Sequence, residues 1–178
     1  MMDHFLEEVV IKRNRTLENI LYMLCNVLMV VCAILAIFWL NVLLNAGFSW
    51  MTVITLLVMA GIAVGLFFYR DRFRMEYEYT FTNGDLDFAI VYNNQKRKTL
   101  GTMRVKNVEA FGPVDSEGFR KLINMPDLKR KNWFLNRGAN LHYFYFQKEN
   151  NRTIIVLEPS EEMVGLIKKY LPVGAWRA

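Results

Sequence analysis

The hydrophobic pattern of the chain changes once, and the change divides the chain into two parts. From Asn19 to Tyr69, 51 residues contain no Asp, Glu, Lys, Arg or His. One crossing of the bilayer core takes about 20 apolar residues, so this stretch predicts two membrane-spanning helices, over residues 20–44 and 50–69. Polar and small residues at 45–49 predict the turn between them. A buried helical pair in a water-soluble protein is a poor alternative, because such helices nearly always carry a polar face.

Basic residues flank this hairpin on one side only. The connecting turn has no charge, whereas Lys and Arg lie before the first helix and after the second. The residues concerned are Lys12, Arg13, Arg15, Arg70, Arg72 and Arg74. Because Lys and Arg near the ends of a span stay in the cytoplasm, we expect an integral protein of the cell membrane with both termini cytoplasmic.

After Arg74 the pattern alternates with a period of two, which is typical of strands. Strands are predicted at 75–81 and 85–92, joined by Asn83-Gly84, a strong hairpin signal. Shorter strands are expected at 99–103, 105–111, 133–135, 141–147 and 153–157. A short helix is predicted at 116–125, and a second at 159–171, where Met163, Leu166, Ile167, Tyr170 and Leu171 form an apolar stripe.

The predicted organisation has three segments. Residues 1–18 form a cytoplasmic segment, either an amphipathic turn on the inner membrane surface or the frayed start of the first helix. Residues 19–70 hold the two transmembrane helices. Residues 71–178 form one cytoplasmic domain of about seven antiparallel strands with an inserted helix and a closing helix, so the whole is an α+β membrane protein.

The stretch from Tyr77 to Phe88 resembles the first hairpin of bacterial pleckstrin-homology-like (PH-like) domains, which often follow a pair of transmembrane helices. This resemblance covers nearly the whole chain in architecture. It implies an antiparallel β-barrel closed by the C-terminal amphipathic helix, and it implies a fold more than a function. Phosphoinositide-binding PH domains resemble one another in a basic first hairpin, whereas this hairpin carries Asp85 and Asp87.

No pattern in the chain predicts a reaction, a metal or a cofactor, so we expect a protein that is not an enzyme. Cys25 and Cys32 both fall in the first helix, about 10 Å apart along its axis, and cannot form a disulfide with each other. His142 heads an aromatic strand and is expected to be a core or rim residue. The carboxylates of the first hairpin are expected to form its solvated face; they are Glu76, Glu78, Asp85 and Asp87.

Three functional hypotheses follow. The first is a membrane-anchored interaction module that recruits a protein partner. The second is a sensor of anionic lipid headgroups, which would use basic residues expected near the membrane or in loops: Arg70, Arg72, Arg74, Lys96, Arg97, Lys98, Lys129, Arg130 and Lys131. The third is an accessory subunit of a membrane transport or enzyme complex, or an enzyme in its own right.

Two further expectations concern partners. Nucleic acid is not expected, because no recognised binding motif accompanies the net charge of +5. Gly61 and Gly65 lie four residues apart, a spacing that lets helices approach closely in lipid. This face would pack either on Ala33 and Ala36 of the first helix or on a second copy, giving a homo-oligomer; the alternative is that Gly is simply common in membrane helices.

Overall fold

The computed structural model describes residues 4–148 and 151–177, and the chain forms two compact units. One unit is a helix pair made by residues 14–75 together with the turn at 92–95. The other is rich in β-structure and takes residues 4–13, 76–91 and 96–177 of the described chain. The chain therefore enters the β-rich unit before the helices as well as after them.

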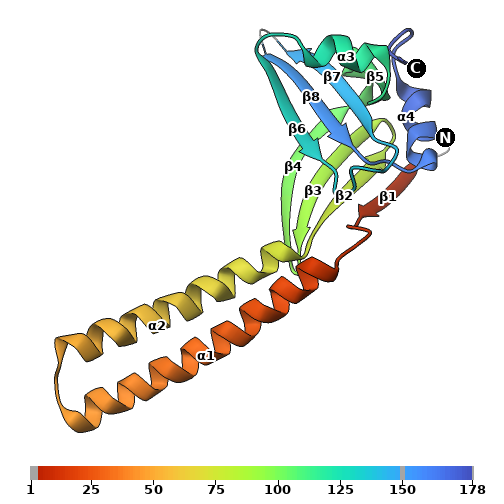
Figure 1. The fold of residues 1–178 in the computed structure, drawn as a ribbon. Coiled ribbons are helices and arrows are strands. Elements are labelled where there is room, and N and C mark those ends of the chain that lie inside the picture. The colour runs from red at the N-terminus through yellow and green to blue at the C-terminus, as the bar shows by residue number, and fades with distance from the viewer. Residues whose placement is uncertain (1–3, 149–150, 178) are drawn as a thin grey trace. The chain divides into compact units, whose positions relative to one another are not determined.

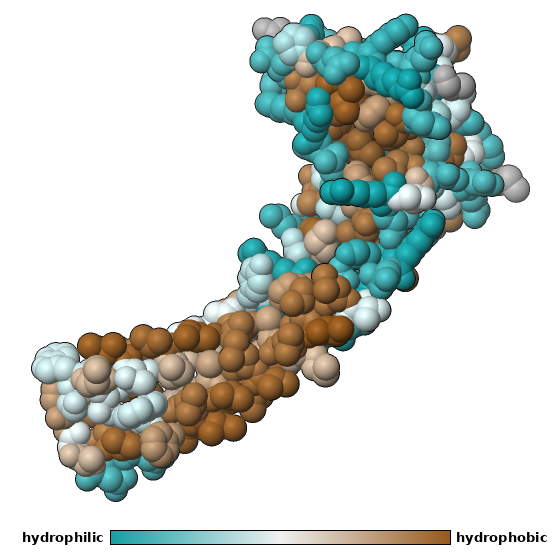
Figure 2. Space-filling model, viewed as in Figure 1, coloured by the Kyte–Doolittle hydropathy of each residue, from teal (hydrophilic) through white to brown (hydrophobic). Residues whose placement is uncertain are grey.

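The helix pair consists of α1 (Thr16–Ala46) and α2 (Trp50–Tyr69), followed by a 3-10 turn, η1 (Arg70–Phe73). Both helices are long and apolar enough to cross a membrane, and only 6% of each apolar window is buried within the structure. Figure 1 shows the two helices side by side, and Figure 2 shows hydrophobic residues along them. The two predicted helices are confirmed, with α1 beginning about one turn earlier than expected.

The glycine pair on α2 does not pack on α1. Gly61 and Gly65 are exposed, and a Cβ added at either would meet nothing within 4 Å beyond its own helix. The expected packing on Ala33 and Ala36 is therefore wrong, because no atom of α1 lies within 4 Å of a Cβ placed at either glycine. Packing on a second copy stays a prediction.

The first sheet has the strand order β1-β2-β3-β4. Its strands are β1 (Phe5–Val10), β2 (Met75–Thr82), β3 (Asp85–Tyr92) and β4 (Lys96–Arg104). β1 runs antiparallel to β2, with Phe5 opposite Thr82 and Val10 opposite Tyr77. Neither expectation for the first residues, an amphipathic turn or a frayed helix, is correct, because their alternating side chains complete a sheet whose next strand follows the helices. The helix pair is thus inserted between two adjacent strands.

The hairpin between β2 and β3 is the one the sequence predicts. Asn83 and Gly84 both have positive φ, 49° and 96°, as a two-residue turn requires. Tyr79, Phe81 and Phe88 are 1% exposed or less and form the core side of this hairpin.

The second sheet has the order β5-β7-β8-β6. Its strands are β5 (Ala110–Pro113), β6 (Leu128–Trp133), β7 (His142–Lys148) and β8 (Asn151–Leu157). β6 runs parallel to β8, whereas β5 and β8 are antiparallel to β7. The two sheets stay separate, so the closed, all-antiparallel barrel predicted from the sequence is wrong.

Charge on the outer strands gives a physical reason for the open arrangement. Lys96-Arg97-Lys98 begins edge strand β4, and Lys129-Arg130-Lys131 lies in edge strand β6, although both triplets were expected in loops. Like charges placed opposite each other destabilise a strand pair, and Lys on an edge discourages further pairing.

Two helices complete the β-rich unit (Figure 1). α3 (Glu117–Ile123) begins at the Ser116 cap and packs Phe119 against Tyr143 of the second sheet, with ring centres 5.2 Å apart. α4 (Glu161–Tyr170) begins at Ser160, whose hydroxyl accepts the Met163 N–H. A short 3-10 turn, η2 (Val105–Asn107), links β4 to β5.

The apolar stripe of α4 is confirmed, with one change in detail. Met163 and Ile167 are fully buried, whereas Leu166 is only partly buried. The ring of Tyr170 meets that of Phe81 at 5.4 Å between centres, which joins the end of α4 to the first sheet.

Candidate functional site

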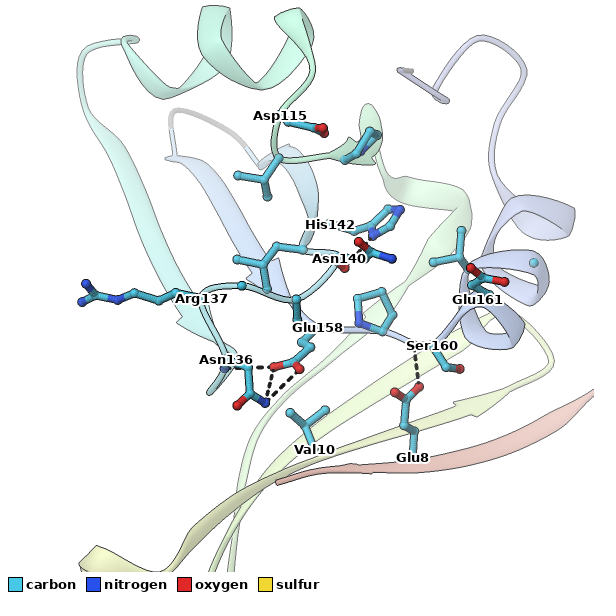
Figure 3. Close-up of a pocket in the computed structure, with 18 of the residues that line it drawn as sticks. Glu8, Val10, Asp115, Asn136, Arg137, Asn140, His142, Glu158, Ser160 and Glu161 are labelled. Atoms are coloured by element: carbon cyan, nitrogen blue, oxygen red, sulfur yellow. Dashed lines mark hydrogen bonds between the residues drawn. The ribbon is translucent and has the colours of Figure 1, made fainter. Parts of the chain in front are cut away.

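The β-rich unit contains a cleft of about 1250 Å³. Four segments form its walls, together with Trp176: the end of β1 with the residues after it, the end of β5 at residues 113–115, the loop between β6 and β7, and the junction of β8 with α4 (Figure 3). Charged and polar groups in the lining include Glu8, Arg13, Asp115, Asn136, Arg137, His142, Glu158, Ser160, Glu161 and Lys168. In Figure 3, Glu8 and Val10 rise from β1 toward the cleft, and Arg137 extends away from the acidic groups.

The start of β1 is held by residues from two other elements. The carbonyl of His4 accepts the Asn83 N–H at 2.9 Å, and the His4 N–H donates to the Asn83 side-chain oxygen at 2.9 Å. The His4 ring nitrogen Nδ1 lies 2.8 Å from the Tyr170 hydroxyl. This end of the strand is therefore tied to the β2–β3 turn and to α4.

The segment that follows β1 is bound by the side chain of Asn136. Its amide nitrogen donates to the Ile11 carbonyl at 2.9 Å, and its oxygen accepts the Arg13 N–H at 2.8 Å. The same amide nitrogen and the Asn136 backbone N–H both donate to the Glu158 carboxylate, at 2.9 and 3.0 Å. Asn136 thus connects the segment that leads into α1 with the end of β8. Sequence reasoning missed this residue, because an Asn in a loop carries no periodic signal.

The Glu8 carboxylate has a raised pKa. Burial is the main cause, and the negative charges of Glu158 and Glu162 raise the pKa further. The Ser160 N–H donates to Glu8 Oε2 at 3.0 Å and opposes these effects. Glu8 therefore favours its neutral form more in the folded protein than in the unfolded chain.

This shift predicts how stability depends on pH. Between the ordinary glutamate pKa of 4.5 and the raised value, the folded protein binds more protons than the unfolded chain, so the Glu8 contribution to stability falls as pH rises. Glu8→Gln keeps an acceptor for the Ser160 N–H and removes the charge. We expect this variant to be at least as stable as wild type at pH 7, with the difference vanishing below about pH 4. Thermal unfolding from pH 3.5 to 8 measures this, and a variant that is less stable at pH 7 would contradict it.

His142 is partly buried, which agrees with the expected core or rim position, and it lines the cleft. Its ring stacks on Phe111 with centres 5.4 Å apart and lies 6.3 Å from the Trp176 ring. Burial lowers the pKa of His142, and the positive charge of Lys168 lowers it further. These contacts are those of a packing residue.

The carboxylates of the first hairpin are only partly the solvated face that was expected. Glu78 is buried at 7% exposure, and its Oε2 lies 3.0 Å from Nε of Arg97. A hydrogen bond with Glu7 and burial raise the pKa of Glu78 against the effect of Arg97. Asp85 pairs with Arg104 at 3.5 Å, and the Thr102 hydroxyl donates to Asp87.

The basic residues after α2 divide into two kinds. The guanidinium of Arg74 lies 4.0 Å from the centre of the Tyr22 ring, and that of Arg70 lies 4.8 Å from the Phe67 ring. Arg70 also pairs with the buried Asp71. Arg72 is exposed. Arg70 and Arg74 thus hold the ends of the helix pair together, and Arg72 is the more accessible of the three.

The two basic triplets lie at different places in the β-rich unit. Lys96 follows directly after the turn at 92–95, in which the Asn93 N–H donates to the Arg74 carbonyl at 2.6 Å. Lys129 instead donates to the side chain of Asn151 at 2.7 Å, at the start of β8. Asn136 joins Ile11 to Glu158 at the end of β8, and the second triplet pairs with residues 153–155, so about 10–17 Å of strand separates the triplet from the segment that leads into α1.

Among the described residues, no group of three or more His, Cys, Asp or Glu side chains is placed to hold a metal ion.

A family model described as a bacterial PH-like domain (DUF6106) matches residues 2–176. The chain belongs to this bacterial PH-like family. The match confirms the resemblance seen in the first hairpin, and it spans β1 and both helices as well as the PH-like sheets. No curated protein and no solved structure matches the chain significantly.

Proposed function

We propose that this chain is a non-enzymatic interaction module that holds a PH-like domain at the cytoplasmic surface of the cell membrane. The observation that carries the proposal is the insertion of the helix pair between β1 and β2. These strands are neighbours in one sheet, so the domain is attached to the helices by two chain segments. The first tether, residues 11–15, reaches at most about 20 Å when fully extended. The second is mostly a 3-10 turn and reaches only about 10 Å.

Two short attachments of this kind favour a domain with restricted motion over one that moves freely on a single linker. A single linker lets a domain rotate about its attachment point, whereas two linkers to adjacent strands restrict that rotation. A partner recruited to the domain would meet it close to the membrane. The shared DUF6106 family supplies the fold but no activity, so the cleft and the exposed strand edges are the surfaces to test.

Membrane topology is the first test. If α1 and α2 cross the membrane, reporters placed after Gly47 and at the C-terminus should report opposite compartments, with the C-terminus inside. The reason is the set of basic residues before α1 and after α2 and the uncharged turn between the helices. A C-terminal reporter outside the cell, or both reporters on the same side, would overturn the proposal.

Recruitment of a partner is tested by capture from membranes in mild detergent. The matched control is Ile167→Asp, which places a charge in the core of the β-rich unit and leaves the sequence of both helices intact. A partner bound by wild type and lost from the control depends on the domain. Equal capture by both would assign binding to the helices, and absence of any specific partner would count against the proposal.

A second candidate function, contact with anionic lipid headgroups, is favoured by the position of Lys96-Arg97-Lys98. This triplet follows the turn bonded to Arg74 at the end of the helix pair. Each basic residue near an anionic surface contributes about 1 kcal/mol, screened by salt. Arg97 pairs with Glu78, so Lys96 and Lys98 are the two residues that would orient a tethered domain, without choosing one lipid over another.

Lysine labelling of the full chain in nanodiscs tests this candidate. We expect Lys96 and Lys98 to be labelled several-fold more slowly in anionic than in neutral lipid, and the difference to shrink at 0.5 M salt. Lys131 of the second triplet serves as the internal control, since it is exposed and lies in the other sheet, and its labelling should not change. Equal labelling of Lys96 in both lipids, or equal protection of Lys131, would contradict a lipid contact at the first triplet.

A further inference from the structure

The two sheets have four outer strands, and these strands are protected from further pairing to different degrees. β4 and β6 each carry three consecutive basic residues. β5 is covered by the C-terminal residues: the Phe111 N–H donates to the Ala175 carbonyl, and the Arg177 N–H donates to the Phe111 carbonyl, each at 2.8 Å. β1 has neither form of protection over its described residues, and it exposes Phe5 (61%) and Val9 (50%).

The backbone of β1 presents hydrogen-bonding groups at this edge. In an antiparallel pair, residues alternate between bonding to the neighbouring strand and pointing away from it. His4 bonds to Asn83, so the alternation assigns Leu6, Glu8 and Val10 to β2. The N–H and C=O groups of Phe5, Glu7 and Val9 then point to the open edge, beside the cleft whose lining includes Val9.

Just beyond β1, the next backbone groups on the same edge are already hydrogen-bonded, and their partner is a side chain. The Asn136 amide bonds to the Ile11 carbonyl and to the Arg13 N–H, on either side of Lys12. A parallel neighbouring strand makes the same two bonds with its backbone. Asn136 therefore takes the place of a strand residue at one end of the edge, and the edge of β1 continues from there along the cleft.

The charges beside the edge indicate which kind of strand would fit. Glu8 faces the cleft from β1, and Glu158 and Glu161 line it from the β8–α4 junction (Figure 3). Three cations also line the cleft. The ammonium of Lys168 lies 3.5 Å from the Trp176 ring centre, Arg137 extends away from the acidic groups (Figure 3), and Arg13 follows the end of β1. A second copy of this chain is a poor occupant, because antiparallel pairing of two β1 strands about their centre would place Glu7 or Glu8 opposite its own copy.

We propose that the open edge of β1 binds an extended segment of a partner protein by strand addition, with basic side chains of that segment entering the cleft beside Glu8. Apolar side chains on the other face of the added strand would cover Phe5 and Val9. Main-chain hydrogen bonds would supply affinity, and the alternation of basic and apolar side chains would supply specificity. The inference rests on the proposed role as an interaction module and names the surface that performs it.

Three eight-residue peptides test the proposal against the full chain in neutral nanodiscs, with empty nanodiscs as the blank. One alternates Lys and Val, one alternates Glu and Val, and one is the Lys-Val peptide methylated on alternate backbone nitrogens. We expect the first to bind, and the other two to bind at least about tenfold more weakly. Equal binding of the Glu-Val peptide would overturn the charge argument, and equal binding of the methylated peptide would overturn strand addition.

Two substitutions locate the site. Val9→Pro removes one outward N–H without removing a bond to β2 and should weaken Lys-Val binding about tenfold, whereas Val9→Thr should bind as wild type does. Glu8→Gln should weaken binding several-fold and reduce its salt dependence. Unchanged binding in Val9→Pro would place the peptide elsewhere.

Hydrogen exchange of the wild-type protein gives a readout that does not depend on how well a variant folds. Added Lys-Val peptide should slow exchange at the N–H groups of Phe5, Glu7 and Val9, while those of Leu6 and Val10 are already slow. Absence of this alternating protection would overturn the proposal. If a cellular partner is captured equally by wild type and Val9→Pro, the interaction module stands and strand addition at β1 fails; if no partner is captured and no peptide binds, both fail.

Discussion

Replacing Ile167 by Asp is expected to unfold the β-rich unit and leave the helix pair folded. Ile167 lies on α4 and is 0% exposed, beside the equally buried Met163. An unpaired charge at such a position costs several kcal/mol, which is comparable to the whole stability of a typical domain of about 5–15 kcal/mol. The helix pair is a separate compact unit and keeps its own apolar contacts.

Limited proteolysis and hydrogen exchange of the full chain in detergent measure this effect. The β-rich unit should become protease-sensitive and lose slow-exchanging amides, while residues of α1 and α2 stay protected. Gly165→Asp is the matched control, because it places the same charge two residues away on the exposed side of α4, where nothing lies within 4 Å. Equal loss of structure in the control, or an unaffected Ile167→Asp protein, would show that α4 does not close the core.

The second large effect is expected for Asn136→Ala. This change removes the amide that bonds the Ile11 carbonyl, the Arg13 N–H and the Glu158 carboxylate. Each lost bond contributes about 1 kcal/mol, and groups left without partners add to the cost, so we expect a loss of roughly 2–4 kcal/mol. The loss should be concentrated at the end of β1, because Asn136 bonds both Ile11 and Arg13 in the segment leading into α1.

The measurement combines thermal unfolding with hydrogen exchange at residues 5–13. Faster exchange at the end of β1, with the centre of β7 and β8 unchanged, is the expected result. Asn140→Ala serves as the control: Asn140 is exposed in the same loop, and its contact with His142 uses the backbone carbonyl, which the variant keeps. Equal effects of the two substitutions would contradict the special role of Asn136.

Several parts of the fold could be predicted because local interactions decide them. An uncharged run long enough to cross a bilayer twice predicts two apolar helices, and the structure contains both. Asn83-Gly84 adopts positive φ at both positions, which few other residue pairs tolerate, so the hairpin follows from two residues. The Ser160 cap and the stripe of Met163 and Ile167 likewise define α4 within one short segment.

The candidate site was not predictable in the same way. The sequence shows the polar residues at 136–142 and at the start of α4, but it does not show that they form one cleft with β1. Glu78 was expected in solvent from its place in the alternation, and its burial follows from Arg97 and Glu7 on two other strands. The basic triplets were expected in loops because three adjacent charges look unfavourable in a strand, yet an edge strand tolerates them.

By itself the sequence determined the helix pair, the first hairpin and the closing helix, since each depends on contacts among residues within a few turns or one β-turn of each other. The tertiary structure decided that residues 5–10 form a strand, because their partner Met75–Thr82 follows only after both helices. It also decided the parallel pairing of β6 with β8 and the bonds of Asn136, because these depend on segments that meet only when both sheets have formed. Long-range pairing of this kind leaves no periodic trace in the chain, and it is what builds the cleft and exposes the edge of β1.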